Sequence, residues 1–218
     1  DYKINIKELD IKPLMRPPSI CPGCPYKALA LSVDKLKKKK KIYAAFGDIG
    51  CSTLLYFLNS LDTVCCMGAS DTTRQGFVLS LPEYASKTIS IVGDSCECHS
   101  GLDATRNAIF RHIPGVKIIL DNSVTAMTGG QPAPSSKTNL AGIPNTFSLK
   151  RAIEAEGGKT VVVDSYNLAE VDKALNEALE EAGKGVFTTM ILEGACIQEV
   201  DHIKTLRKIS RNYDLCKR

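Results

Sequence analysis

Long apolar runs are absent from this 218-residue chain, and no stretch reaches the length needed to span a bilayer. We expect no signal peptide before the first motif, at Cys21. No Gly-x-Gly-x-x-Gly sequence opens a helix, which disfavours a generic nucleotide-binding fold. No aromatic residues are interleaved with the lysine run Lys37–Lys41, so we interpret it as a solvated helix end rather than a nucleic-acid-binding surface. We therefore expect neither a membrane nor a nucleic acid as a partner.

Composition and cysteine count indicate one large domain in a reducing compartment. Apolar residues make up 44% of the chain, ample for a core, and the net charge is only +4. Nine cysteines, an odd number, fit a disulfide scaffold poorly and favour the cytoplasm and cofactor chemistry. We expect a linker or arm at 1–20, the domain at 21–200 and a basic tail at 201–218. The chain begins at Asp1 without a methionine, as we expect of a piece of a longer protein.

Two apolar runs in the middle of the sequence predict a βαβ unit. Ile89–Val92 and Val116–Leu120 are predicted to be buried parallel strands, and Leu102–His112 between them has apolar residues in helical phase. A right-handed crossover places both strands in one sheet. We predict a doubly wound α/β domain with a mostly parallel sheet and helices on both faces. The other expected helices are 25–37, 53–61, 72–81, 148–155 and 168–182, and the other expected strands are 42–46, 63–67, 160–164 and 186–192, with a loop at 129–146.

Each central strand is followed by a side chain that carries oxygen, Asp94 after the first and Asn122 after the second. Ligands of open α/β sheets bind beyond the carboxyl ends of the strands, where both residues lie. Carboxylate and amide oxygens suit a hard cation such as Mg²⁺, which would keep phosphate oxygens as further ligands. The pattern therefore predicts a diphosphate site. A helix N-cap is the alternative for Asp94, weakened by the second strand that ends in Asp121-Asn122.

The same residues resemble a known family pattern. Gly93-Asp94-Ser95, followed by Asp121-Asn122, resembles the thiamine diphosphate motif, usually Gly-Asp-Gly and then Asn-Asn. With the motifs around it, the sequence resembles the diphosphate-binding domain of the 2-oxoacid:ferredoxin oxidoreductases over roughly Arg16 to Cys196. It looks closest to the larger (alpha) subunit of the indolepyruvate branch. The motifs that carry the resemblance are Cys21-Pro-Gly-Cys-Pro25, Gly47-Asp-Ile-Gly-Cys51, Cys66-Met-Gly-Ala-Ser70, His99-Ser-Gly101, Thr125-Ala-Met-Thr128 and Thr128-Gly-Gly-Gln131.

The resemblance implies a set of residues around thiamine diphosphate and Mg²⁺. Asp94, Asn122 and the backbone carbonyl of Val124 would hold the metal. Ser95 stands where the family usually has a second glycine, so it narrows the backbone freedom there while still offering a backbone N–H. For Met67, core filling is the alternative to contact with the thiamine rings. The implied cofactor-binding residues are Tyr26, Cys51, Met67, Gly68, Gly93, Asp94, Ser95, Cys96, Asn122, Val124, Met127 and Thr128.

Four cysteines match, position by position, the ligands of one [4Fe–4S] cluster in the redox members of the family: Cys21, Cys24, Cys51 and Cys196. The first two lie in a turn that opens a helix, where thiolates are stabilised. Four thiolates suit zinc as well as iron and sulfide, so a structural zinc, or free thiols that only pack, stay as alternatives. The branch usually carries a cysteine-rich, ferredoxin-like tail, whereas this chain has only Cys216 near its end.

Other residues near these motifs have less specific roles. His99 lies just past the diphosphate motif and is a candidate catalytic residue that would reach the substrate; a helix cap or a satisfied polar residue is the alternative. Asp121 stands where many relatives have asparagine, and we predict that it forms an Asx turn. The remaining cysteines of the domain are expected to be small buried residues: Cys65, Cys66, Cys96 and Cys98.

The activity that the resemblance implies is oxidative decarboxylation of a 2-oxoacid, an arylpyruvate in this branch, to acyl-CoA, with electrons leaving through the cluster to ferredoxin. The family's activating carboxylate comes from a separate pyrimidine-binding domain or subunit, which we do not find in these 218 residues. The chain would therefore supply half a site in a homo- or hetero-oligomer. Two alternatives stay open. One is a non-redox thiamine diphosphate decarboxylase or acetolactate-synthase-like subunit, and the other is a catalytically silent, zinc-stapled partner-binding module.

Overall fold

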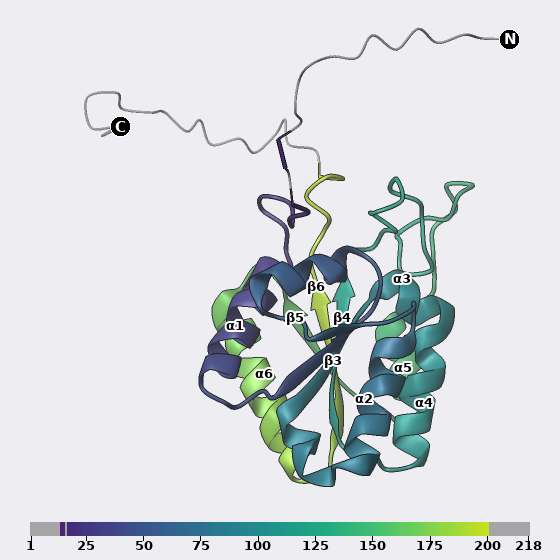
Figure 1. Ribbon diagram of the computed structural model, residues 1–218. Helices are drawn as coiled ribbons and strands as arrows, with labels where there is room; N and C mark the ends of the chain where they lie inside the picture. The colour runs from purple at the N-terminus through teal and green to yellow at the C-terminus, as the bar shows by residue number, and fades with distance from the viewer. Residues whose placement is uncertain (1–13, 16, 201–218) are drawn as a thin grey trace, which may run out of the picture.

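Six parallel strands form the central sheet of the computed structural model, which describes residues 14, 15 and 17–200 (Figure 1). The expected arm at 1–20 lies largely outside the described residues, and the expected tail at 201–218 lies wholly outside them. The order across the sheet is β2-β1-β3-β4-β6-β5, and every pair of neighbours is parallel. The predicted doubly wound α/β fold is thus confirmed. The strands are β1 (Ala44–Gly47), β2 (Thr63–Val64), β3 (Thr88–Gly93), β4 (Gly115–Asp121), β5 (Lys159–Asp164) and β6 (Phe187–Glu193).

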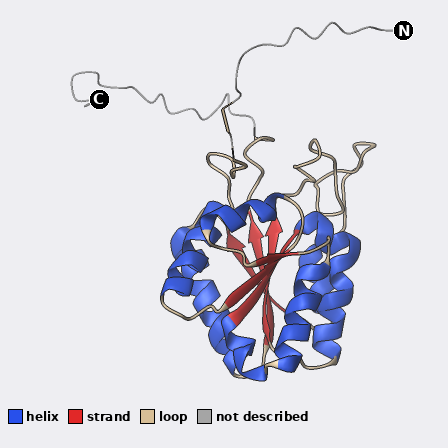
Figure 2. Ribbon diagram, in the orientation of Figure 1, coloured by secondary structure: helices blue, strands red, loops and turns tan. Residues whose placement is uncertain are grey.

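Helices cover both faces of this sheet (Figure 2). Helices α1 and α6 pack against each other and, through α6, on β4 and β6, whereas α2 packs on β1 and β3 and also contacts α4. The helices are α1 (Lys27–Lys38), α2 (Ala69–Ser80), α3 (Asp94–Cys96), α4 (Leu102–Phe110), α5 (Leu149–Ala155) and α6 (Leu168–Gly183). Three further segments are tighter or wider helices: the 3-10 helices η1 (Cys51–Leu58) and η2 (Pro82–Lys87), and the π-helix η3 (Glu97–Gly101).

The central strands are apolar because both of their faces are covered. All six residues from Gly115 to Leu120 in β4 are buried, as are Thr88 to Val92 in β3. Parallel strands of this kind carry near-continuous apolar runs, which is why the sequence identified these two so clearly. The largest apolar cluster lies under α1 and α6, where Val33 and Leu175 meet Ile118.

Two expected elements between β1 and α2 were wrong in type or length. The segment expected as a helix at 53–61 is the 3-10 helix η1, which ends at Asn59 in the left-handed conformation. The strand expected at 63–67 is only two residues long, since the chain leaves the sheet edge after Val64. Helix α2 begins at Ala69, three residues before its expected start.

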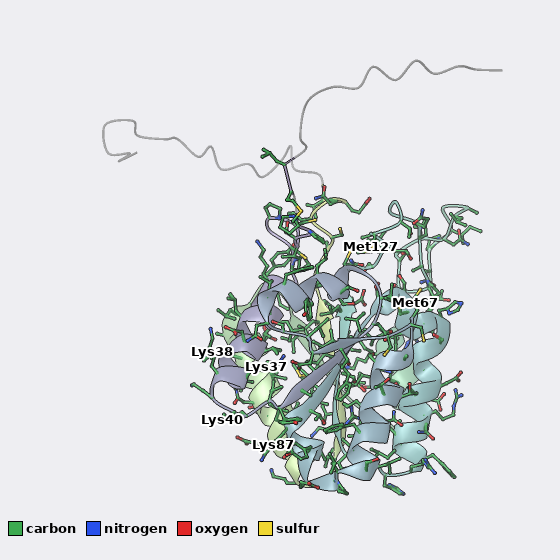
Figure 3. All side chains as sticks on the ribbon, viewed as in Figure 1. Lys37, Lys38, Lys40, Met67, Lys87 and Met127 are labelled. Atoms are coloured by element: carbon green, nitrogen blue, oxygen red, sulfur yellow. The ribbon has the colours of Figure 1, made fainter. Side chains whose placement is uncertain are left out.

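The lysine-rich end of α1 behaves as a solvated helix end. Lys38 and Lys40 are exposed, while Lys37 is paired with Asp62 at 2.7 Å. In Figure 3 these lysines, with Lys87, lie on the side of the molecule away from Met67 and Met127, and Lys40 and Lys87 lie toward its lower end. Within the part of the chain that the structure describes, no helix combines the length and apolar character needed to cross a membrane.

Candidate functional site

A cavity opens at the carboxyl ends of β1, β3 and β4, and loops that follow these strands form its wall. Eleven of the twelve residues predicted to contact the cofactor line this cavity; the exception is Gly68, next to the lining residue Met67. His99 is not part of the lining, and its side chain is exposed on η3. The lining residues are Tyr26, Ile49, Gly50, Cys51, Ser52, Met67, Gly93, Asp94, Ser95, Cys96, Leu120, Asn122, Val124, Thr125, Ala126, Met127 and Thr128.

Asp94 begins helix α3 directly after β3 and is 3% exposed. Gly93, not Asp94, occupies the N-cap position, so the helix-cap alternative does not describe this residue. Its Oδ2 accepts a hydrogen bond of 2.6 Å from the Ser135 hydroxyl, which belongs to the long loop after β4. Burial raises the pKa of the Asp94 carboxyl to about 7, and the nearby charge of Asp121 adds to the shift, while the Ser135 hydroxyl opposes it. A buried carboxyl with an acidic neighbour is an environment that a bound cation would stabilise.

The turn after β4 is held by two successive Asx interactions. Asp121 Oδ1 accepts from the Ser123 N–H at 2.9 Å, which confirms its predicted turn, and Asn122 Oδ1 accepts from the Val124 N–H at 3.2 Å. Ser123 takes the left-handed conformation at φ 60°. These contacts turn the chain sharply, so that Asn122 and Val124 both face the cavity.

A hydroxyl pair joins the two diphosphate-motif loops across the cavity wall. Ser95 Oγ lies 2.8 Å from Thr125 Oγ1, which links the start of α3 to the loop after β4. Ser95 replaces the glycine usual at this position, and its side chain therefore makes a contact that glycine could not make. On the opposite wall, the buried Tyr26 hydroxyl donates to the Leu120 carbonyl at 3.4 Å, and burial raises its pKa well above the ordinary range.

Asp48 organises a part of the site that sequence reasoning missed. It is fully buried, and its two carboxylate oxygens accept from the Gly68 and Ser70 N–H groups at 2.6 and 2.7 Å. Gly68 has φ +82°, and a side chain there would collide with the Ser100 hydroxyl. Asp48 thereby holds Met67 at the cavity. The available signal was its position directly after a predicted strand, in the motif Gly47-Asp-Ile-Gly-Cys51.

The structure places the Cys21–Cys24 turn against the segment that contains Cys196. The Cys24 N–H donates to the Cys21 carbonyl at 3.1 Å, and a Cβ on Gly23 would contact Ile197 at 3.4 Å. Burial raises the pKa of the Cys24 thiol to about 11, with smaller contributions from Cys21, Cys51 and Cys196. Across residues 14, 15 and 17–200, no three His, Cys, Asp or Glu side chains form a group that could already hold a metal ion.

The prediction that the remaining cysteines are buried was wrong for two of them. Cys65 and Cys66 are exposed, because the chain leaves the sheet edge after the short strand β2 and runs along the surface toward Gly68. Cys96 is buried, and its thiol lies 3.7 Å from the Ile49 carbonyl. Cys98 is partly buried against the second apolar cluster.

The cavity is mainly apolar apart from the Asp94–Asn122 end. Met67 and Met127 are each 53% exposed, and both line the cavity (Figure 3). Flexible, polarisable methionine side chains adapt to ligands of irregular shape. The arrangement therefore combines an oxygen-rich end, suited to a cation and a diphosphate, with an apolar end, suited to aromatic rings.

Comparison with known proteins identifies the type of domain. The family described as "Thiamine pyrophosphate enzyme, C-terminal TPP binding domain" matches residues 44–189. Indolepyruvate oxidoreductase subunit IorA of Thermococcus kodakarensis is 36% identical over 188 residues, which are 80% of this chain and 29% of the relative. The 2-oxoglutarate synthase subunit KorB of Archaeoglobus fulgidus is 25% identical over 217 residues, 92% of this chain and 79% of the relative. The chain thus spans about a third of the length of the IorA relatives that it matches.

Solved structures show the same fold. A 2-oxoglutarate:ferredoxin oxidoreductase from Magnetococcus marinus superposes with a TM-score of 0.70 and 20% sequence identity, covering 88% of this chain and 68% of that chain. At this identity the likeness concerns the fold. A benzoylformate decarboxylase from Polynucleobacter necessarius has a TM-score of 0.54 and 12% identity, with 76% of this chain covered and 33% of that one.

Proposed function

Because the chain belongs to the thiamine pyrophosphate enzymes through their C-terminal TPP-binding domain, we propose that it supplies the diphosphate-binding half of a 2-oxoacid:ferredoxin oxidoreductase. The similarity to indolepyruvate oxidoreductase subunits favours this class over other thiamine enzymes. The observation that carries the proposal is the single cavity that unites Asp94, Asn122 and Val124 with Tyr26 and Met67. These residues come from four separate segments of the chain, and the fold gathers them at the carboxyl ends of neighbouring strands.

The residues at the oxygen-rich end fit Mg²⁺ and a diphosphate. Asp94 and Asn122 are buried and offer side-chain oxygens, and the Val124 carbonyl would complete a set of three protein ligands. Mg²⁺ generally takes few protein ligands and completes its coordination with substrate phosphates and water. The backbone N–H groups at the start of α3, from Ser95 onward, would meet the diphosphate beside the metal.

Contacts between the segments that carry the cysteines support the proposed iron–sulfur cluster. The packing of Gly23 on Ile197, and of Gly194 on Pro25, brings the Cys21–Cys24 turn to the segment of Cys196. Cys51 lines the cofactor cavity, so a cluster on these thiolates would lie close to the proposed thiamine site. Burial raises the pKa of the Cys24 and Cys51 thiols, and these thiols would release their protons on binding the cluster, because thiolates are its ligands.

Bound in this cavity, thiamine diphosphate supplies the electron sink for decarboxylation of a 2-oxoacid. The apolar end, with Met67 and Met127, favours an arylpyruvate as the substrate. We propose that coenzyme A takes the acyl group, that ferredoxin takes the electrons in the cytoplasm, and that a pyrimidine-binding domain or subunit completes the site. This chain holds the diphosphate, encloses one side of the cofactor and shields it from water.

The diphosphate site is tested by calorimetric titration of the chain with thiamine diphosphate in the presence of Mg²⁺. Asp94→Asn removes the negative charge of a proposed ligand while keeping its shape, and it is expected to weaken Mg²⁺-dependent binding strongly. Asp103→Asn is the matched control, because Asp103 is an exposed aspartate on α4 whose one ion pair within the described residues is with Arg106. Equal binding by wild-type protein and Asp94→Asn would contradict the proposed role of Asp94.

The redox part is tested by purification without oxygen, followed by analysis of iron, acid-labile sulfide and zinc. Iron and sulfide at about four each per chain are expected, and Cys196→Ser should lower both. About one zinc without sulfide would instead indicate a structural metal and a non-redox thiamine enzyme. Neither metal in the wild-type chain would contradict the cluster but leave the diphosphate site intact.

A further inference from the structure

Four charged side chains are buried beneath the cofactor cavity, on the face of the sheet that α2 and α4 cover. They are Asp71 and Arg74 on α2, Glu97 on η3 and Lys117 in the middle of β4, and none is more than 1% exposed. Two are acidic and two are basic, so the group is electrically balanced. None of the four lines the cavity.

The ammonium group of Lys117 contacts three neighbouring residues. Its Nζ lies 2.6 Å from Glu97 Oε2 and donates to the Thr105 hydroxyl at 2.7 Å and to the Gly101 carbonyl at 3.0 Å. Thr105 in turn donates to Glu97 Oε1 at 3.0 Å. The ammonium thus donates two hydrogen bonds and forms a close ion pair with Glu97 Oε2, while the other carboxylate oxygen of Glu97 accepts from Thr105. Among the described residues, Glu97 Oε2 has this ion pair but no hydrogen bond. A side chain at Gly101 would collide with this carboxylate, so the glycine leaves it the room that it occupies.

Asp71 extends the network to α2 and β3. Its carboxylate accepts from Arg74 at 3.0 Å, from Ser90 at 2.9 Å and from Gln75 at 2.8 Å, and Lys117 Nζ lies 4.0 Å away. Burial raises the pKa of Asp71, but the charges of Arg74 and Lys117 outweigh it, so the pKa is lowered. Ser90 and Lys117 are direct partners in the register of β3 and β4. The network thus ties one helix to the two strands that lead into the site.

The connection to the cavity runs along the backbone. Lys117 lies in the strand that leads to Asn122, and Glu97 lies three residues after Asp94. Helices α3, η3 and α4 follow one another from Asp94 to Phe110, and the π-helical turn in their middle contains Glu97 and Gly101. Single π-helical turns inside α-helices are frequent at functional sites. The Lys117 contacts fasten this irregular turn to β4.

We propose that the buried Lys117–Glu97 pair is a positioning device that sets Asp94 and Asn122 at the separation required by Mg²⁺. This inference rests on the proposed thiamine diphosphate site. Mg²⁺ demands near-ideal octahedral geometry at short distances, whereas Ca²⁺ accepts longer and more varied ones. A site whose two walls are fixed relative to each other therefore selects Mg²⁺ over Ca²⁺. Lys117 and Glu97 act through Asp94 and Asn122 and touch neither metal nor cofactor.

The test compares the wild-type chain with Glu97→Gln, the double variant Glu97→Gln/Lys117→Met, and the control Leu175→Ala. Glu97→Gln keeps the shape but leaves Lys117 without its carboxylate, and the double variant restores electrical balance without the ammonium contacts. Leu175 is fully buried in the apolar cluster of α6, so its truncation destabilises the fold away from the network. Each protein is titrated with thiamine diphosphate in the presence of Mg²⁺, and then of Ca²⁺, and unfolded with urea.

We expect the double variant to be more stable than Glu97→Gln but to bind Mg²⁺ with thiamine diphosphate about 10-fold or more weakly than wild type, since residues that orient metal ligands have effects of that size. Binding with Ca²⁺ should weaken less, so the preference for Mg²⁺ falls. Leu175→Ala should keep the wild-type preference.

A Mg²⁺ preference that simply follows stability across the variants would overturn the positioning role. A folded double variant with wild-type preference would overturn it as well. If the double variant does not fold, a wild-type preference in Glu97→Gln alone would have the same consequence. Absence of thiamine diphosphate binding with either cation, both in the wild-type chain and in its complex with the pyrimidine-binding domain or subunit, would overturn the proposed function itself, and this inference with it.

Discussion

The face of the sheet under α1 and α6 and the face under α2 and α4 are filled by different kinds of side chain. Under α1 and α6, aliphatic residues such as Leu29, Leu175 and Leu192 form the largest apolar cluster. Under α2 and α4, the corresponding layer contains the buried ion pairs of Asp71 and Lys117. The residues named on the two faces are all buried. The two faces differ in how strongly the contacts between the sheet and its helices depend on the relative orientation of the groups in contact.

Apolar contacts fix a helix loosely, because dispersion and the hydrophobic effect depend little on orientation. Hydrogen-bonded ion pairs have narrow geometry, but removing charges from water costs so much that apolar substitutes are often at least as stable. The α1–α6 face therefore contributes chiefly stability. The α2–α4 face gives up some stability for a defined position of the segments that lead into the cavity.

The largest effect is expected for Lys117→Met, which sharpens this contrast. It leaves Glu97 buried without its cation, and we expect a loss of about 3–5 kcal/mol in the free energy of unfolding, measured with urea. Adding Glu97→Gln should recover much of that loss, since the uncompensated charge is then gone. Equal free energies of unfolding for Lys117→Met and for the double variant would show that Lys117 and Glu97 are not energetically coupled.

A truncation on the apolar face comes next. Leu175→Ala should lower the free energy of unfolding by about 3 kcal/mol, through lost burial and the cavity left behind. Thiamine diphosphate binding, measured by calorimetry at a temperature where the variant is folded, should stay at the wild-type level. A large change in that binding would break the division between the two faces.

Asp48→Ala tests the contact that holds Met67 at the cavity. It removes a charged acceptor from the Gly68 and Ser70 N–H groups, and we expect a loss of about 2 kcal/mol in stability together with weaker thiamine diphosphate binding. Asp62→Ala is the control, because Asp62 also accepts a backbone N–H, that of Ala45 at 2.7 Å, but lies outside the cavity lining. Weaker binding in both variants would argue against a specific role for Asp48.

The smallest effect is expected at the start of α6. Asn167 accepts from the Glu170 N–H at 3.3 Å as the helix N-cap, and Asn167→Ala should lower the free energy of unfolding by about 1 kcal/mol. Cofactor binding should not change, since α6 has no residue in the cavity lining. Thermal unfolding with and without thiamine diphosphate and Mg²⁺ would measure both quantities.

The sequence predicted the features that depend on local pattern. The apolar runs of β3 and β4 identified the central strands, and the topology of a parallel sheet then placed Asp94 and Asn122 at one edge. The 3-10 form of η1 escaped prediction because its residues follow no period that separates it from an α-helix. The exposure of Cys65 and Cys66 escaped for a related reason: it depends on where a short edge strand ends.

Features that depend on contacts between distant segments could not be predicted. Lys117 interrupts an apolar strand, which is a visible signal of a buried charge, but its partners Glu97 and Thr105 are identified only by the fold. The hydrogen bond from Ser135 to Asp94 joins residues 41 positions apart through a loop without regular structure. Asp48 belongs to a motif that the sequence analysis identified, but its role depends on hydrogen bonds from the Gly68 and Ser70 N–H groups, which only the fold brings close to it.

Tyr26 gives the protein an optical property of its own. The chain contains seven tyrosines and no tryptophan, so tyrosine emission is not masked by the stronger indole fluorophore. Of the tyrosines that the structure describes, Tyr26 alone lines the cavity, and its ring is shielded from water. Occupation of the cavity by an aromatic cofactor should quench its fluorescence, so the unlabelled chain can report cofactor entry in real time.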